Sequence, residues 1–270
     1  MTNAVPLSFR DIDGLGFAAA NGGDTSLMPM AYKPASLGPL FELIHMQAAR
    51  RLPQHPKGGS WLASNGAAPM VSALHENRER WISADNHRMG FIRARRSGPD
   101  AENWLTSFLI NAQTAAQKIA GLPLQSARYL AMAMEEMENN IHDHSEASDT
   151  GLLAFRAVAG VFEFVASDRG IGILASLQRA QEYRSMHDHG SALRVALNTG
   201  TSRYGANSGH GNGFRPIFLG LAELNGELRF RSGDHALIID GTSPALATSQ
   251  LQQKPFMDGF FVSVRCRAAA

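Results

Sequence analysis

Two amphipathic helices followed directly by a pair of strands constrain the fold of this chain more than any other feature. Residues 103–119 and 124–144 have helical spacing, and the second helix repeats its apolar residues at intervals of three and four positions. Those residues are Leu130, Met134, Met137 and Ile141. Residues 152–158 and 161–167 then predict two strands that meet at Ala159-Gly160. The second part of the chain therefore predicts a packed mixture of helices and strands.

Turn signals divide the rest of the chain into shorter elements. After the strand pair, the predicted helices are 173–185, 191–198 and 214–224, the predicted strands are 227–232, 235–240 and 260–267, and 199–213 is a loop rich in Gly, Ser and Asn. In the first hundred residues, 11–39 predict loops and short elements, 40–51 and 70–82 predict helices, and 87–96 predict a strand. A break at Ser97-Gly98-Pro99 divides the chain into residues 1–100, of unknown fold and suited to partner binding, and a second domain, residues 101–270.

The composition excludes several classes of protein. Of the 270 residues, 44% are apolar and 18% are charged, which excludes a wholly disordered chain. Because 25 Lys and Arg residues balance 24 Asp and Glu residues, we expect no strong electrostatic attachment to nucleic acid or to an anionic membrane. No segment has the length and hydropathy of a membrane span, and the N-terminus lacks the pattern of a secretory signal. Cys266 is the single cysteine, so no internal disulfide forms and we expect a cytoplasmic protein.

The helix predicted at 124–144 carries a polar motif beside its apolar face. Glu136 and Asn140 are four residues apart, so they stack on one face, and Asp143 follows about one turn later. An amide oxygen is a hard, neutral ligand suited to Mg²⁺, and a nearby carboxylate can orient or deprotonate an attacking water. Taken alone, the motif also fits the solvated face of an amphipathic helix.

Two glycine-containing motifs follow this helix. Asp168-Arg169-Gly170-Ile171-Gly172 comes directly after an apolar run, so a carboxylate at the tip of a buried strand can accept a hydrogen bond from an exocyclic amine. Its glycines allow a tight turn and the close approach of a planar ring. Gly209-His210-Gly211-Asn212-Gly213 precedes a predicted helix, and alternating glycines at such a position expose N–H groups that favour phosphate. Arg203 can add positive charge at the outermost phosphate.

In this order, the three motifs resemble the N, G1 and G2 boxes of the GHKL superfamily, which includes DNA gyrase B subunits, the large heat-shock chaperone, sensor histidine kinases and MutL-type repair proteins. The resemblance covers about residues 103–267, and residues 168–183 and 196–203 are similar to stand-alone bacterial members known only as ATP-binding proteins. It implies an α+β Bergerat fold, a two-layer sandwich of a mixed, mostly antiparallel sheet with helices on one face, beside a smaller N-terminal region.

The resemblance also implies ATP and Mg²⁺ as cofactors and a role for each residue of the site. Glu136 occupies the place of the catalytic carboxylate, Asn140 would coordinate Mg²⁺, and Asp168 would hold the adenine amino group. The rest of the predicted nucleotide site consists of Asp143, Gly170, Gly172, Thr201, Ser202, Arg203, Gly209, Gly211 and Gly213. The segment Asp258-Gly259-Phe260 stands where many members carry Gly-Thr.

Three functions would use such a site. An ATP-hydrolysing or ATP-gated switch would close residues 198–214 over Mg-ATP, with Glu136 activating water. A protein kinase, of the anti-sigma serine type or the histidine type, would use the same pocket for phosphoryl transfer. A non-catalytic module would only sense ATP. Glu136 favours the first function, and we expect a protein partner, leave a homodimer open, and expect neither a membrane nor a nucleic-acid partner.

Overall fold

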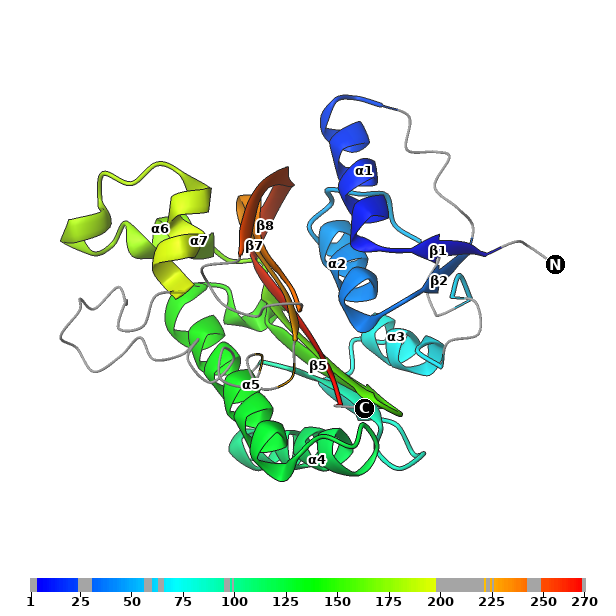
Figure 1. The fold of residues 1–270 in the computed structure, drawn as a ribbon. Coiled ribbons are helices and arrows are strands. Elements are labelled where there is room, and N and C mark those ends of the chain that lie inside the picture. Colours follow the sequence, from blue (N-terminus) through cyan, green and yellow to red (C-terminus); the bar gives the residue numbers. More distant parts are fainter. Residues whose placement is uncertain are drawn as a thin grey trace.

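One antiparallel sheet organises the molecule (Figure 1). The computed structural model describes residues 4–23, 31–55, 60–62, 66–94, 98, 100–197, 221, 224, 226–241 and 249–268. Within them the strands of the large sheet are β3 (Arg80–Ile82), β4 (Met89–Arg93), β5 (Leu152–Val158), β6 (Val161–Asp168), β7 (Glu227–Asp240) and β8 (Gln250–Arg267). Their order is β3-β4-β5-β6-β8-β7, and each neighbouring pair is antiparallel. The predicted α+β class is confirmed.

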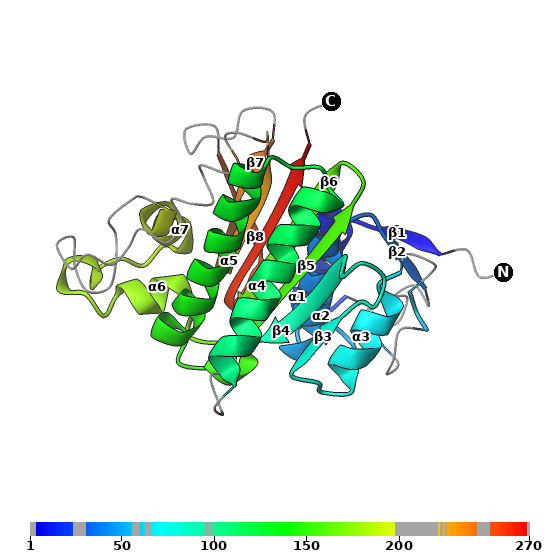
Figure 2. The ribbon, with the colours of Figure 1, turned by 90° about the horizontal axis from the view of Figure 1, so that it is seen from below.

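Among the described residues, the helices on one face of this sheet include α4 (Ala101–Lys118), α5 (Leu124–His144), α6 (Gly172–Leu177) and α7 (His189–Leu197). Figure 2 shows α4 and α5 lying across the sheet, with α6 and α7 to one side. The predicted apolar stripe of α5 is fully buried against this face, together with Phe155, Phe164 and Val264 of the sheet. The predicted stripe and the buried face of α5 agree because a helix with one continuous apolar face must turn that face toward the core. Within the described residues, no helix combines the length and apolar character needed to cross a bilayer.

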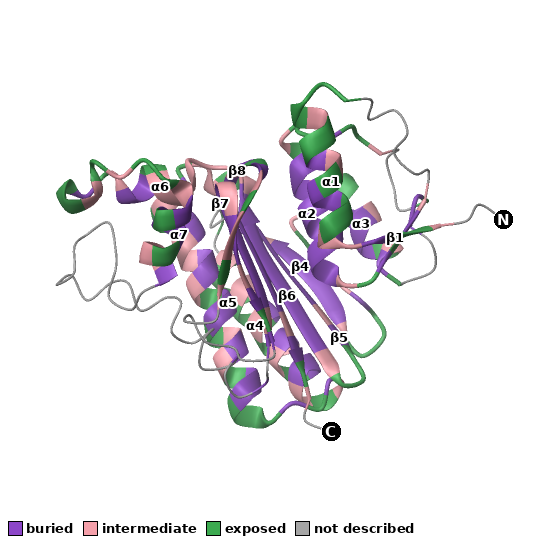
Figure 3. Cartoon of the chain, turned by 45° about the horizontal axis from the view of Figure 1, so that its top comes forward, coloured by how far each residue is buried: buried purple, intermediate pink, exposed green. Residues whose placement is uncertain are grey.

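A second layer covers the opposite face of the sheet, where the sequence had predicted helices on one face only. This N-terminal layer consists of β1 (Val5–Leu7), α1 (Phe9–Ala20), β2 (Tyr32–Pro34), α2 (Leu37–Ala48) and α3 (Ala68–His75). Adjacent residues of β6 point to opposite sides, so Phe164 packs on the α5 side and Val165 packs under the N-terminal layer. Figure 3 shows the sheet buried between the two layers. A strand that is apolar on both faces needs cover on both.

The N-terminal region is joined to the sheet in a way that the sequence did not indicate. Strands β3 and β4 precede residue 100, yet β4 pairs with β5, with Phe91 opposite Ala154. The sheet therefore continues across the expected domain boundary. Helix α1 extends into residues 11–39, which were predicted as loops and short elements, and a helix of 12 residues was not expected there. Its glycine content has a packing reason, because a Cβ on Gly16 would lie 2.7 Å from Cγ of Pro255 in β8.

A buried carboxylate positions α2 on the sheet. Oε2 of Glu163 in β6 accepts a hydrogen bond from the backbone N–H of Leu37, the first residue of α2, at 3.1 Å. Arg156 and Arg265 form ion pairs with the same carboxylate at 2.7 and 3.2 Å. A negative charge at a helix N-terminus is favourable, because the first N–H groups have no partner within the helix. The contact fixes the N-terminal layer over β6 and β8.

The remaining elements differ from expectation in detail. The strands predicted at 227–232 and 235–240 form one strand, β7, with a bulge at Gly233, and β8 begins at Gln250 rather than near residue 260. Helix α6 ends at Leu177 and is followed by a short 3-10 turn, Gln181–Tyr183. Nearly all of the helix predicted at 214–224 lies outside the described residues.

Candidate functional site

Asp168 is a buried carboxylate at the end of the central strand β6. It pairs with Phe260 of β8, and its side chain is almost completely buried. Oδ1 accepts a hydrogen bond from the backbone N–H of Gly170 at 2.7 Å. Oδ2 is buried and has no hydrogen-bond partner in the described part of the chain. This atom is therefore a hydrogen-bond acceptor without a donor. Buried polar atoms rarely lack a partner, and a bound ligand is one way to supply it.

Burial also shifts the acidity of this group. Desolvation raises the pKa of Asp168 from 3.8 to about 7, and the hydrogen bond from Gly170 and the positive charge of Arg169 only partly oppose it. A donor placed against Oδ2 would favour the ionised form and offset part of the cost of burial. The carboxylate is therefore suited to hold a hydrogen-bond donor such as an exocyclic amine.

The turn after Asp168 is fixed by neighbouring backbone and hydroxyl groups. The N–H of Arg169 donates to Oγ1 of Thr150 at 2.9 Å, and the N–H of Ile171 donates to the carbonyl of Ser145 at 2.9 Å. Oγ of Ser232 accepts from the N–H of Ile173 at 3.0 Å and donates to the carbonyl of Gly259 at 2.7 Å. None of these partners belongs to the predicted motif.

The two glycines of this turn are required by the packing of the protein itself. A side chain at Gly170 would collide with the backbone of Ser145 at the end of α5. Gly172 has a φ of +76°, in the left-handed region, and a Cβ there would lie 2.9 Å from Oγ of Ser232. Contact of either glycine with an adenine ring remains a prediction.

Helix α5 presents the acid and the amide that the sequence singled out. Glu136 and Asn140 are both half-buried, and Asp143 is exposed. Burial, followed by the nearby carboxylates of Glu135 and Asp143, raises the pKa of Glu136. The side-chain nitrogen of Asn140 is buried without a hydrogen-bond partner among the described residues. Since an amide can be rotated to exchange its nitrogen and oxygen, this end of Asn140 can present either a donor or an acceptor.

The end of α5 and the turn after β6 lie side by side. The carbonyl of Ser145, the residue after α5, accepts from Ile171, and Glu146 forms an ion pair with Arg179 just beyond α6. Asn140 is five residues before Ser145, which is about 7.5 Å along the helix axis. The structure thus brings Asp168, Gly170 and Gly172 to the end of the helix that carries Asn140.

The third predicted motif cannot be placed. The loop at 198–214, with its predicted site residues Thr201, Ser202, Arg203, Gly209, Gly211 and Gly213, lies outside the described residues. Among the residues that are described, no group of three or more His, Cys, Asp or Glu side chains is arranged to hold a metal ion. A Mg²⁺ held by one amide and by phosphates would not require such a group.

A set of residues behind the site, on α2 and at the start of its following loop, was not predicted from the sequence. Nε2 of His45 lies 2.9 Å from the carbonyl oxygen of Asp258, and burial lowers the pKa of His45 to about 4, although this hydrogen bond opposes the shift. Arg51 donates two hydrogen bonds to the Asp258 carboxylate, each at 2.9 Å. Gly259 follows, with a φ of +67°, and a Cβ there would collide with the backbone of Asp168. The contacts of His45 and Arg51 with Asp258 join residues more than 200 positions apart, and Gly259 and Asp168 are 91 positions apart, so no local pattern could reveal them.

Comparisons of the chain with models of protein families, with curated proteins and with solved structures found no match. The resemblance to the GHKL superfamily therefore stays a prediction that depends on the three motifs.

Proposed function

We propose that this chain binds Mg-ATP between α5 and the turn that follows β6, and that it acts as an ATP-hydrolysing or ATP-gated switch of the GHKL type. The observation that carries the proposal is the buried Oδ2 of Asp168, an acceptor with no donor among the described residues. The adenine amino group supplies a donor of the kind this atom lacks. The half-buried amide of Asn140, with its own unpartnered nitrogen, lies on the neighbouring helix.

Each residue has a defined part in this proposal. Asp168 selects adenine through its amino group, since a base with a carbonyl at that position would leave two acceptors facing each other. Asn140 holds Mg²⁺, which supplies positive charge to the phosphates when it is bound. Glu136 lies one turn before Asn140, and its raised pKa suits a group that takes a proton from an attacking water. The contacts of Ser145, Thr150 and Ser232 hold the turn in place before the ligand arrives.

Calorimetric titration with ATP tests the proposal directly. We expect the full chain to bind ATP more tightly with MgCl₂ than with EDTA, and Asp168→Asn to abolish binding. Asp85→Asn is the matched control, because Asp85 is an exposed aspartate in the turn between β3 and β4 whose ion pair within the described part of the chain is with Arg88. Ordinary ATP affinity in the folded Asp168→Asn variant would reject the adenine assignment.

The fate of the terminal phosphate separates the functions that share this pocket. Release of inorganic phosphate that depends on Glu136 supports the ATP-hydrolysing switch. Transfer of radiolabel from ATP to a protein partner, without phosphate release, would assign the pocket to a protein kinase. Binding with neither reaction would leave a module that senses ATP.

A further inference from the structure

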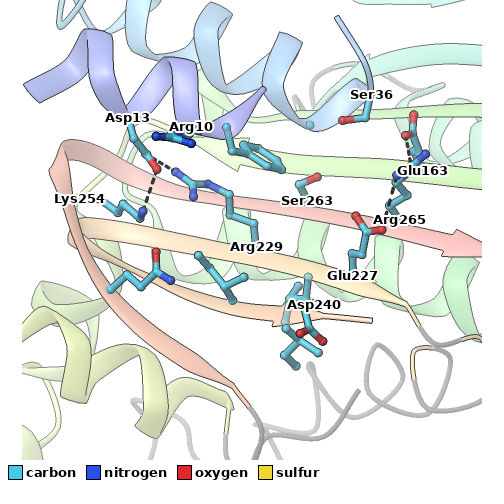
Figure 4. A pocket seen from close by; sticks show the side chains of 16 residues that line it. Arg10, Asp13, Ser36, Glu163, Glu227, Arg229, Asp240, Lys254, Ser263 and Arg265 are labelled. Carbon is cyan, nitrogen blue, oxygen red and sulfur yellow. Dashed lines mark hydrogen bonds and ion pairs between the residues drawn. The ribbon is translucent and has the colours of Figure 1, made fainter. Parts of the chain in front are cut away.

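A cavity of about 450 Å³ lies between the N-terminal layer and the sheet, on the side of the sheet opposite α5. Its walls come from α1, from the residues around the start of α2, and from β6, β7 and β8. Figure 4 shows that charged side chains gather at its two ends, Arg10, Asp13, Arg229 and Lys254 at one and Glu163, Glu227, Asp240 and Arg265 at the other. A cavity of this size can hold a small organic molecule.

Five side chains at the first end form a buried ion-pair network. Oδ1 of Asp13 accepts a hydrogen bond from Arg229 at 2.6 Å, and its Oδ2 pairs with Nζ of Lys254 at 2.8 Å. Glu42 pairs with Arg229 at 2.8 Å and also with Arg231. None of the five side chains is more than 12% exposed. Two acids therefore face three bases, and the network has one positive charge that no acid within it balances.

This surplus charge can be assigned to Lys254. Asp13 keeps its pair with Arg229 when Lys254 is removed, and Glu42 keeps both of its arginines, so neither acid needs the lysine. An unbalanced buried charge is unfavourable unless an opposite charge lies close to it. Arg10, which is exposed and forms no ion pair with the described residues, lines the same end of the cavity and adds a second positive charge.

The other parts of the cavity do not offer the same excess. At the far end, Arg265 lies 3.2 Å from Glu163 and 3.5 Å from Glu227. At that end Glu163 also pairs with Arg156 and Glu227 with Arg267, so both of these acids have cationic partners among the described residues. Apolar side chains, including Phe9 and Ile238, complete the walls.

We propose that this cavity binds a small organic anion. A carboxylate or phosphate group of the ligand meets Lys254 and Arg10, and an apolar body of the ligand lies against Phe9 and Ile238. The site is separate from the proposed nucleotide site and does not depend on it, because the sheet lies between the two.

Calorimetric titration of the full chain with four probes that share one alkyl chain tests this proposal. Octanoate and octyl phosphate carry the anionic head group, 1-octanol carries none, and octylammonium carries the opposite charge. We expect the two anions to bind and to raise the melting temperature, and the other two probes to do neither. Octanoate affinity should fall about tenfold or more in Lys254→Gln and in Arg10→Gln, because each variant removes one charge-assisted hydrogen bond.

Two further variants separate binding in the cavity from binding elsewhere. Ile238→Trp keeps every charge and fills the cavity from a half-exposed position, so it should abolish octanoate binding. Arg128→Gln, at an exposed arginine on α5, should leave it unchanged. If Lys254→Gln fails to fold, Arg10→Gln decides the question, because Arg10 forms no ion pair of the network. Equal binding of octanol or octylammonium, failure of both anions to bind, or unchanged affinity in Arg10→Gln would overturn the proposal.

Discussion

Replacing Asp168 by Asn should change the pH dependence of folding in a way that burial of the carboxyl group dictates. Burial raises the pKa of Asp168 from 3.8 to about 7 in the folded state. Unfolding restores the ordinary value, so between about pH 4 and pH 7 the folded state holds a proton that the unfolded state has released. The free energy of unfolding therefore falls as the pH rises through this range, and the ionised carboxylate is most destabilising above pH 7.

The size of the effect follows from the shift. One pKa unit corresponds to about 1.4 kcal/mol, so a shift of about three units costs the folded protein about 4 kcal/mol at pH 8. About 2 to 3 kcal/mol of that cost develops between pH 5 and pH 8, and the rest is already present at pH 5. Asparagine does not titrate, so Asp168→Asn removes the whole pH-dependent contribution of this side chain to the free energy of unfolding.

Urea unfolding of the wild type and the variant at pH 5 and at pH 8, both without nucleotide, measures this quantity. The stability of Asp168→Asn relative to the wild type should rise by about 2 to 3 kcal/mol between the two pH values. Burying an amide nitrogen in place of Oδ2 has a fixed cost, which cancels in the comparison, as does the titration of all other groups. A relative stability that is the same at both pH values would refute the argument, because it would mean that the carboxyl group ionises as it does in water.

Three further predictions concern the groups around the site. Glu136→Gln should keep ATP binding and lose about a hundredfold or more of hydrolysis, measured as phosphate release; undiminished release would exclude Glu136 as the base. Gly170→Ala should destabilise the protein by about 1 to 3 kcal/mol in urea unfolding, because the added carbon meets the backbone of Ser145. Gly14→Ala in α1, where a Cβ meets open space, is its control and should be neutral or stabilising. When the pH falls from 8 to 5, the wild type should lose about 2 kcal/mol more stability than His45→Asn. The reason is that the pKa of His45 is about 4 in the folded state and 6.5 in the unfolded state, so only the unfolded wild type takes up this proton; equal losses would contradict this.

The sequence predicted the elements whose patterns lie within short windows. The stripe of α5 and the apolar runs of β5 and β6 are visible in such windows, and the structure confirms all three elements. Helix α1 was missed because its glycines are ordinarily a loop signal, although Phe9, Ile12 and Ala19 pack in the N-terminal layer. Its evidence lies elsewhere, in the close approach of Gly16 to Pro255 and in the hydrogen bond from the N–H of Ser8 to Asp11 at 2.8 Å. Pro255, which leaves no space for a side chain at position 16, is 239 positions away, so no short window of sequence contains both residues.

In the candidate site, too, the residue with a local sequence pattern was predicted and its long-range partners were not. Asp168 was predicted at a strand tip because an apolar run precedes it, and the structure has it there, buried. The groups that hold its turn could not be predicted, since the carbonyl of Ser145 and the hydroxyls of Thr150 and Ser232 come from three separate segments. Hydroxyl groups acquire a role only when the fold places a backbone N–H opposite them.

The N-terminal layer supports the candidate site from behind, which gives the first hundred residues a physical part in it. His45 and Arg51 hold the backbone and the side chain of Asp258, and Gly259 then lies against Asp168 in a conformation that favours glycine. A carboxylate that is costly to bury stays in place because the chain around it has few alternatives: Phe260 is paired to its backbone, Gly170 binds its Oδ1, and α2 fixes the residues that precede Phe260. The destabilising group is thus surrounded by contacts that resist its relaxation, and the proposed role of Asp168 in binding a ligand requires such contacts.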